Sequence, residues 1–312
     1  MGKIVCIGEC IMDLLPLKAG GSEYVAKAGG APANVAACVA RLGGDGCYMG
    51  KLSEDGFSEL IASKLVDAGV SLRYAVRDAA YPTAIALVTL TPDGDRSFTF
   101  YRKETADLMF SPEDVPDDFA KRGDILHFCS VGLVESPLKR AHEKAVRLAR
   151  EAGAYVSFDV NLRPALYSSE AACVEAVNAF LPYADIVKVT DDELAILTGE
   201  RDEVAGVGKL LRRAESAAVV FVTKGEKGAT VHDREGGSVS VPAAKVKVAD
   251  TTGAGDCFIG SVLFLISRDG FGKRSEDYLP HLKFASAACG IVCSKKGAIE
   301  SMPTYDEVMK NV

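Results

Sequence analysis

The spacing of apolar residues along the chain predicts alternating strands and helices, most regularly from residue 124 onward. Short runs rich in Val, Ile and Phe predict strands at residues 124–131, 155–160, 186–189 and 219–223. Apolar positions at helical spacing predict helices between them, at residues 136–152 and 171–181. Such alternation indicates an α/β fold, with a mostly parallel sheet covered on both faces and ligand sites beyond the carboxyl ends of its strands.

The first third of the chain predicts a strand at residues 3–7 and a helix that follows the glycine pair Gly29-Gly30. Residues 83–91 and 96–102 predict a hairpin with its turn at Pro92-Asp93-Gly94-Asp95. Because both faces of this hairpin carry apolar residues, it must cover either a cleft of its own chain or the surface of a partner. With no repeat, linker or compositional boundary, residues 1–312 are expected to form one domain with a small β insertion.

The segment Asp250-Thr251-Thr252-Gly253-Ala254-Gly255-Asp256 joins a valine-rich, strand-like segment at residues 239–248 to an apolar helix expected at residues 257–266. Free backbone N–H groups and the helix dipole favour an anion at such a helix N-terminus. A phosphate loop of the common type would have Lys in place of Asp256. A carboxylate there is better suited to accept a proton from a substrate hydroxyl while the neighbouring amides hold phosphoryl charge. The sequence alone gives equal weight to an aspartate that only caps the helix.

Two further polar residues of the first 40 are candidates for substrate contacts. Asp13 lies in an apolar segment, where a carboxylate needs hydrogen-bond donors such as sugar hydroxyls or the partner of a salt bridge. Asn34 lies in the first turn of its predicted helix, where its amide could point into a cleft.

Composition narrows the function classes. The 312 residues are 48% hydrophobic and 25% charged, as in soluble globular proteins, and carry a formal charge of -7. No basic cluster with interleaved aromatic residues favours nucleic-acid binding. Nine cysteines without a Cys-x-x-Cys pair indicate reduced thiols. Charged residues in the N-terminal apolar stretch argue against a signal peptide, and the longest apolar run is too short to span a membrane, so a cytoplasmic location is expected.

Taken together, Gly29-Gly30-Ala31-Pro32-Ala33-Asn34 and the segment from Asp250 to Asp256 resemble the two signatures of the ribokinase-like (PfkB) family of sugar kinases, in their expected order and separation. The resemblance extends from about residue 8 to residue 303. It implies a three-layer α/β/α fold with a β-sheet lid, here from about residues 10–27 and 83–102. It also implies a reaction in which ATP with Mg²⁺ phosphorylates a hydroxymethyl group of a sugar.

The resemblance assigns roles residue by residue. Asp256 would be the catalytic base, which the helix dipole should help to keep ionised, and the anion hole would be formed by the amides of Gly253, Ala254 and Gly255. The sugar would contact Asp13, Gly29, Gly30 and Asn34. The nucleotide would lie against Lys188, Glu193, Thr223, Gly225, Gly228, Gly253, Gly255, Ala285 and Cys289. Glu193 would hold Mg²⁺ through water, and a monovalent cation such as K⁺, which some members bind, would lie near Asp250, Gly297 and Ser301.

The sugar is indicated by three segments that look most like those of fructokinases: Ala31-Pro32-Ala33, residues 96–102, and residues 159–167. Thr190, where the family's Asn-x-x-Glu motif begins with Asn, agrees with fructokinases. Arg102 and Arg163 are expected at the open end of the sugar cleft, although a surface ion pair is the alternative for each. Because Arg also suits a carboxylate, a 2-keto-3-deoxygluconate kinase is the near alternative.

Two broader alternatives stay open, another sugar or nucleoside kinase of the family and a catalytically silent sugar or nucleotide sensor on the same scaffold. The apolar lid strands predict a homodimer formed through them.

Overall fold

A nine-stranded sheet forms the centre of the computed structural model, which describes residues 1–18, 20–90 and 96–312. The strands are β1 (Ile4–Ile7), β4 (Gly46–Leu52), β5 (Ser71–Arg77), β8 (Ile125–Cys129), β9 (Tyr155–Asp159), β10 (Ile186–Thr190), β11 (Val219–Thr223), β12 (Ala229–Asp233) and β13 (Ser238–Val241). Their order is β13-β12-β11-β10-β9-β8-β1-β4-β5. All pairings are parallel except those of β12, which runs antiparallel to both of its neighbours.

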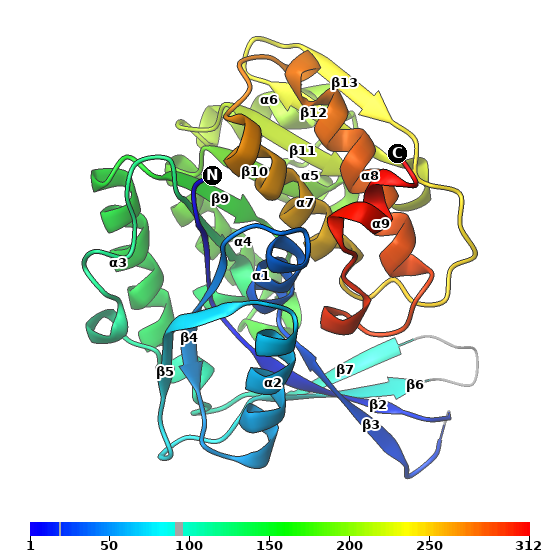
Figure 1. Ribbon diagram of the computed structural model, residues 1–312. Helices are drawn as coiled ribbons and strands as arrows, with labels where there is room; N and C mark the ends of the chain where they lie inside the picture. The colour runs from blue at the N-terminus through cyan, green and yellow to red at the C-terminus, as the bar shows by residue number, and fades with distance from the viewer. Residues whose placement is uncertain (19, 91–95) are drawn as a thin grey trace.

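Helices cover both faces of this sheet. Successive residues of a strand point to opposite faces, so the apolar strands place apolar side chains on both. On β1, Ile4 and Cys6 belong to one apolar cluster, and Val5 and Ile7 belong to the other. The first cluster packs against α1 (Ala31–Arg41), α2 (Gly56–Asp67), α7 (Ala254–Asp269), α8 (Leu279–Cys293) and α9 (Tyr305–Met309). The second packs against α3 (Pro137–Glu151), α4 (Glu170–Phe180), α5 (Asp191–Thr198) and α6 (Glu203–Arg213) (Figure 1).

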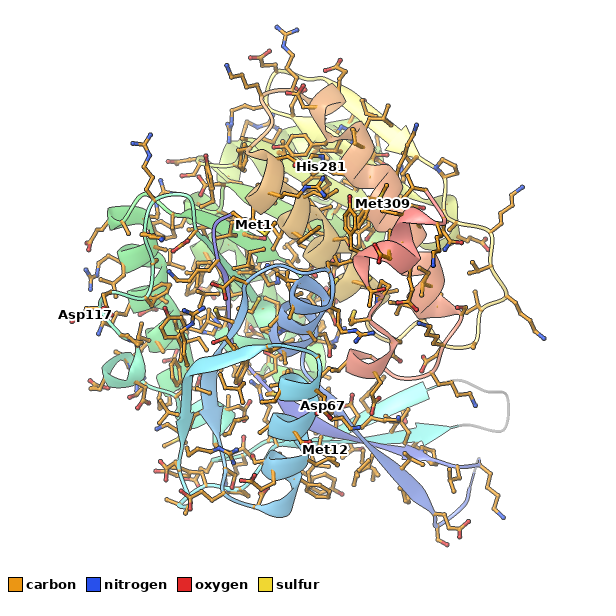
Figure 2. All side chains as sticks on the ribbon, in the orientation of Figure 1. Met1, Met12, Asp67, Asp117, His281 and Met309 are labelled. Carbon is orange, nitrogen blue, oxygen red and sulfur yellow. The ribbon has the colours of Figure 1, made fainter. Side chains whose placement is uncertain are left out.

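A second, smaller sheet extends from one side of this body (Figure 1). It contains β2 (Ile11–Pro16), β3 (Tyr24–Gly29), β6 (Ile85–Leu90) and β7 (Arg96–Tyr101), in the order β3-β2-β6-β7. Met12, at the base of β2, is fully buried in the first cluster (Figure 2). The two sheets together confirm the predicted fold class. The predicted turn at Pro92-Asp93-Gly94-Asp95 lies outside the described residues.

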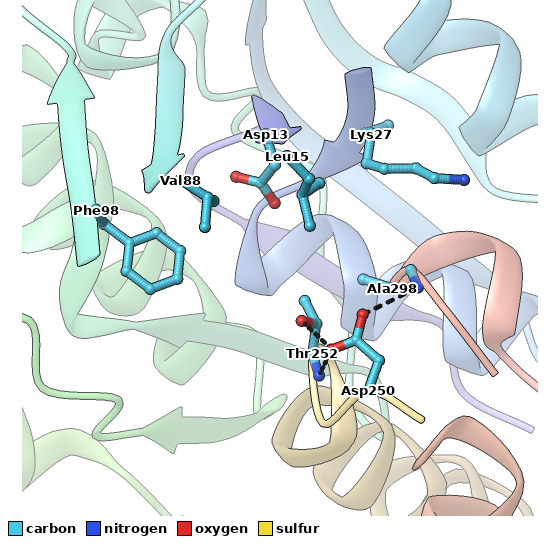
Figure 3. Close-up of a pocket in the computed structure, with 10 residues that line it drawn as sticks. Asp13, Leu15, Lys27, Val88, Phe98, Asp250, Thr252 and Ala298 are labelled. Atoms are coloured by element: carbon cyan, nitrogen blue, oxygen red, sulfur yellow. Dashed lines mark hydrogen bonds between the residues drawn. The ribbon is translucent and has the colours of Figure 1, made fainter. Parts of the chain in front are cut away.

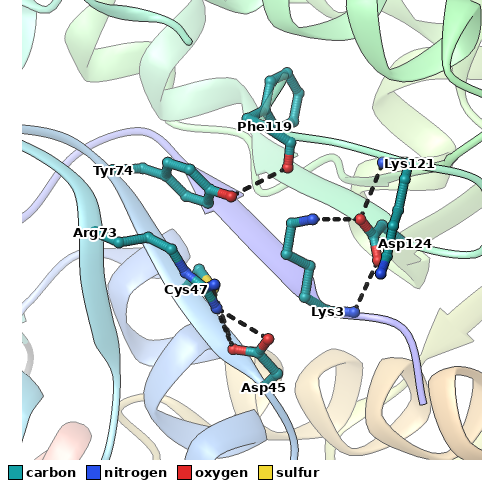
Figure 4. A network of polar contacts seen from close by, with 8 residues as sticks. All are labelled: Lys3, Asp45, Cys47, Arg73, Tyr74, Phe119, Lys121 and Asp124. Atoms are coloured by element: carbon teal, nitrogen blue, oxygen red, sulfur yellow. Dashed lines mark hydrogen bonds and ion pairs between the residues drawn. The ribbon is translucent and has the colours of Figure 1, made fainter. Parts of the chain in front are cut away.

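Polar contacts fasten the amino ends of the central strands (Figure 4). Just before β8, the Asp124 carboxylate accepts hydrogen bonds from the backbone amides of Lys3 and Lys121, each at 3.0 Å. Arg73 on β5 donates to both carboxylate oxygens of Asp45, just before β4, at 2.7 and 2.9 Å. The carboxyl ends, where parallel sheets bind ligands, lie at the opposite edge.

Several predicted boundaries are wrong. Residues 239–248 were expected to be strand, but the strand β13 ends at Val241. It is the edge strand of the sheet, and no described strand pairs with residues 242–248. Val246 and Val248 are consequently 41% and 60% exposed. Helix α7 begins at Ala254, three residues earlier than predicted. Residues 46–77, for which no element was predicted, form β4, α2 and β5. Among the described residues, no helix is long and apolar enough to cross a membrane.

Candidate active site

The N-terminus of α7 presents Asp256 at the carboxyl edge of the sheet. Gly253 is the N-cap residue and has φ +79°, a left-handed conformation that favours glycine. Asp256 lies in the first turn of the helix and is not its N-cap residue. Instead, Asp256 Oδ2 accepts a hydrogen bond of 2.8 Å from Nδ2 of Asn34 on α1. The interpretation of Asp256 as a simple helix cap is therefore wrong.

Burial raises the pKa of Asp256, and the hydrogen bond from Asn34 and the charges of Lys188 and Arg163 offset part of this rise. Desolvation therefore outweighs the stabilisation of the ionised form that we expected from the helix dipole. A raised pKa suits a general base, because proton transfer is most efficient when the pKa of the base lies near the working pH. Asn34 Oδ1 is buried and has no hydrogen-bond partner within the described part of the chain.

A small hollow of about 40 Å³ lies between the small sheet and the turn that precedes α7. Figure 3 shows Asp13, Val88 and Phe98 of the small sheet on one side of it, with Asp250 and Thr252 on the other. Burial and the charge of Asp256 raise the pKa of Asp13 to about 7. A Cβ atom at Gly29 would lie 2.6 Å from Asp13 Oδ2, so a larger residue there would displace this carboxylate.

A groove of about 1140 Å³ lies on the other side of the same turn. Its lining includes most of the residues predicted to contact the nucleotide, namely Lys188, Thr223, Gly225, Gly228, Gly255 and Cys289. Ala285 is fully buried in the core and does not line the groove. Ser286, Cys289, Gly290 and Cys293 form the groove face of α8, and Ala285, one turn before Cys289, lies at the buried edge of that face. The assignment of Ala285 to the nucleotide site is therefore wrong.

The sequence analysis also missed part of this groove. Residues 242–248, interpreted above as strand, line one side of it as a loop. No polar motif marks this loop in the sequence, and only the valines of the segment gave a pattern.

Lys188, at the centre of β10, is buried beside the first turn of α7. Its ammonium nitrogen lies 3.0 and 3.1 Å from the two carboxylate oxygens of Asp159 on β9. A Cβ atom at Gly255 would lie 3.1 Å from the same nitrogen. Burial would lower the pKa of Lys188, but the carboxylates of Asp159, Glu193 and Asp256 outweigh it and raise this pKa. A charged ammonium group therefore borders both the groove and the anion-binding turn.

Glu193 is buried, and both of its carboxylate oxygens are occupied by backbone donors. Oε1 accepts a hydrogen bond of 2.8 Å from the Leu162 amide, and Oε2 accepts one of 2.8 Å from the Thr190 amide. It forms a capping box with Thr190 at the start of α5. The described residues contain no group of three His, Cys, Asp or Glu side chains that could hold a metal ion. This arrangement fits Mg²⁺ held mainly by phosphate oxygens and water, with Glu193 contributing at most through water.

The three residues predicted for a monovalent cation are only partly brought together. The two oxygens of Asp250 accept hydrogen bonds from the Thr252 amide at 3.0 Å and from the Gly297 amide at 3.3 Å. Ser301 is buried, and its hydroxyl donates to the Ala298 carbonyl at 2.8 Å. Asp250 and Gly297 are thus neighbours, and the Ser301 hydroxyl is engaged elsewhere.

The two predicted sugar-binding arginines have different surroundings. Arg163 is exposed, and its charge lowers the pKa of Asp256. Arg102 is only 4% exposed and donates from Nε to Asp107 at 2.6 Å and from Nη1 to the Val131 carbonyl at 2.8 Å. Its expected position at the open end of a cleft is therefore wrong, as is the alternative of a surface ion pair. Its Nη2 is buried without a hydrogen-bond partner in the described ranges.

Comparisons with known proteins agree with this geometry. A family model described as pfkB family carbohydrate kinase matches residues 1–305. Fructokinase-1 of Oryza sativa subsp. japonica is 40% identical, over 98% of this chain and 96% of its own length. The fructokinase of Vibrio cholerae O395, solved with fructose, ADP and calcium ion, is 32% identical, with a TM-score of 0.91 and coverage of 100% of this chain and 99% of its own.

A second solved structure has a different named substrate. The aminoimidazole riboside kinase of Salmonella enterica, solved with aminoimidazole riboside and an ATP analog, is also 32% identical and covers 99% of each chain, with a TM-score of 0.87. Because the family model spans nearly the whole sequence and relatives match it from end to end, the chain belongs to the pfkB family of carbohydrate kinases.

Proposed function

We propose that the protein is a fructokinase, which transfers the γ-phosphoryl group of ATP to the C6 hydroxyl of D-fructose and gives fructose 6-phosphate. The observation that carries this proposal is the position of Asp256. The turn before it separates the groove, lined by Thr251, Ala254 and Gly255, from the hollow, lined by Asp250 and Thr252. A base at that position can meet a sugar hydroxyl from one side and a phosphoryl group from the other.

The catalytic roles follow from these contacts. Asn34 orients the Asp256 carboxylate, which accepts the proton of the attacking hydroxyl. The backbone amides of Gly253, Ala254 and Gly255 and the ammonium of Lys188 stabilise charge on the transferring phosphoryl group. Asp13 and the unpartnered Oδ1 of Asn34 can accept hydrogen bonds from sugar hydroxyls.

ATP occupies the groove in this proposal, with its phosphates toward Gly255 and its base toward Cys289 and Gly290 of α8. Mg²⁺ bound to the phosphate oxygens would neutralise part of their charge. We keep K⁺ as an accessory cation beside Asp250 and Gly297, with backbone carbonyls as its ligands. The Ser301 hydroxyl has no part in that site.

Fructose is favoured because the similar protein of Oryza sativa is a fructokinase and because the fructokinase of Vibrio cholerae was solved with fructose. ADP release should be measured with fructose, ribose, 2-keto-3-deoxygluconate, nucleosides and aminoimidazole riboside. We expect the highest kcat/KM with fructose. A higher value with aminoimidazole riboside or the keto acid would replace the proposed substrate, and no release with any of them would indicate a sensor.

The small sheet acts in this proposal as a lid over the sugar and as the contact surface of a homodimer. Its exposed apolar side chains, between 38% and 62% exposed, are Leu17, Tyr24, Val25, Phe98 and Tyr101. Because neighbouring strand residues point to opposite faces, these side chains expose apolar surface on both faces of the small sheet, which favours an interaction surface. Sedimentation velocity at micromolar concentration should show a dimer, which Tyr101→Lys should weaken. Tyr183→Lys, at an exposed tyrosine outside the small sheet, is the matched control. A wild-type protein that sediments as a monomer would disprove the dimer.

A further inference from the structure

Glu9 has a buried carboxylate and takes no part in the catalytic roles proposed above. It lies between β1 and β2 and is only 1% exposed. Its Oε1 accepts a hydrogen bond of 3.0 Å from the backbone amide of Ala31, the first residue of α1. The Glu9 backbone is packed equally closely, since a Cβ atom at Gly30 would lie 2.5 Å from the Glu9 carbonyl oxygen. Glu9 thus holds the helix end that carries Asn34.

The same carboxylate and the buried Arg102–Asp107 ion pair adjoin one segment, since the Cys129 Sγ lies 3.8 Å from both carboxylate oxygens of Glu9 and Arg102 donates to the Val131 carbonyl at 2.8 Å. Burial raises the pKa of Glu9 to about 7, and the charge of Arg102 is the strongest influence that opposes the rise. Burial by itself would lower the pKa of the Arg102 guanidinium. The negative charges of Asp107 and Glu9 outweigh this effect, so the pKa is raised. Arg102 immediately follows β7, the last strand of the small sheet. Glu9 therefore also borders the point where this sheet rejoins the main body.

Three elements with predicted sugar contacts consequently meet at one side chain. Asp13 is on β2, which begins two residues after Glu9. Asn34 is on α1, and Glu9 accepts a hydrogen bond from the first backbone amide of that helix. Arg102, with its unpartnered Nη2, is held beside Glu9 by Asp107 and by the Val131 carbonyl. A carboxylate can accept a hydrogen bond at a helix N-terminus and also balance the positive charge of a guanidinium. A neutral side chain of the same shape can accept the hydrogen bond but cannot balance the charge.

We propose that Glu9 is a positioning residue for the sugar, which fixes the first turn of α1 and the Arg102 guanidinium in one arrangement so that Asp13 and Asn34 meet the same sugar molecule. Glu9 itself does not touch the reacting atoms. This inference rests on the proposed function and adds to it the group that sets the geometry of the sugar site.

The test is Glu9→Gln, which keeps the oxygen that accepts from Ala31 and removes the charge that acts on Arg102. Fructose binding is measured by calorimetry with a non-hydrolysable ATP analogue present, together with the KM values for both substrates. We expect the Kd and KM for fructose to rise by about tenfold, the scale for removal of a buried charged partner, with the KM for ATP within twofold of wild type. Glu23→Gln, at an exposed carboxylate before β3, is the matched control.

A double-mutant cycle with Arg102→Lys tests whether Glu9 acts through Arg102. Lysine keeps the charge but loses the guanidinium fork, so Glu9→Gln should weaken fructose binding in that background by clearly less than in the wild type. A lower melting temperature with an unchanged Kd for fructose would show a merely structural role and overturn the proposal. So would purely additive effects, or equal losses for fructose and ATP.

Failure of the proposed function gives a different result. The wild-type protein itself would then neither bind nor phosphorylate fructose. The sugar that it phosphorylates fastest in the substrate panel would replace fructose as the probe for Glu9→Gln.

Discussion

Replacing Asp256 by Asn should lower kcat by roughly 10²- to 10⁴-fold, the usual contribution of a general base. The amide has the same shape, and its oxygen can still accept the hydrogen bond that Asn34 donates. Binding of ATP and fructose should therefore change little, so the loss should appear in kcat and not in KM. Steady-state kinetics and calorimetry of the variant measure the two effects separately.

The matched control is Asp269→Asn, at the other end of α7, where the exposed carboxylate pairs with Arg268. This variant should keep wild-type kcat. An Asp256→Asn variant that turns over within fivefold of wild type would remove the base assignment. A variant that no longer binds either substrate would mean that Asp256 maintains the structure of the site and does not act in proton transfer.

Replacing Lys188 by Met should lower both stability and activity. It leaves the Asp159 carboxylate buried without its ion-pair partner, which typically costs about 3–5 kcal/mol of unfolding free energy. It also removes the ammonium group beside Gly255, and the loss of one such electrostatic contact typically lowers kcat by roughly 10²- to 10³-fold. Chemical denaturation and kcat measured on the folded protein report the two losses.

The double variant Asp159→Leu/Lys188→Met separates folding from catalysis. Removing both charges from the interior should recover most of the lost stability, because an apolar pair of suitable size often replaces a buried ion pair without cost. The activity should stay low. If kcat returned together with stability, Lys188 would have only a structural role.

The sequence predicted the elements whose local pattern is strong. The parallel strands from β8 to β11 are nearly continuous apolar runs, and the glycines before Asp256 mark a turn because glycine readily adopts the left-handed conformation found at Gly253. Residues 46–77 were missed because β4 is buried on both sides and contains Gly46, Tyr48, Gly50 and Lys51, a composition that resembles no simple strand pattern. What makes it a strand is its pairing with β1 and β5, which no local window contains.

The site shows the same division. Its individual residues could be proposed from motifs, but their surroundings depend on contacts between distant segments. Asp256 was ambiguous until its partner, 222 residues away in sequence, was placed. Arg102 looked like a surface residue because nothing near it in sequence shows that it donates to the carbonyl of Val131, 29 residues away. Glu9 had the same signal as Asp13, a carboxylate in an apolar stretch, and received no role.

Because the hollow under the small sheet is small, the measured affinity for sugar includes both the binding contacts and the cost of making room for the sugar. With a space of about 40 Å³, the hollow can admit roughly three or four water molecules, at about 10–15 Å³ each, but not a hexose. A hexose that contacts Asp13 under the small sheet has to widen this hollow, and the free energy of the widening is subtracted from the intrinsic binding free energy. Substitutions along β2, β3, β6 and β7 that never touch the sugar should thus shift its apparent Kd in proportion to how far they favour the open arrangement.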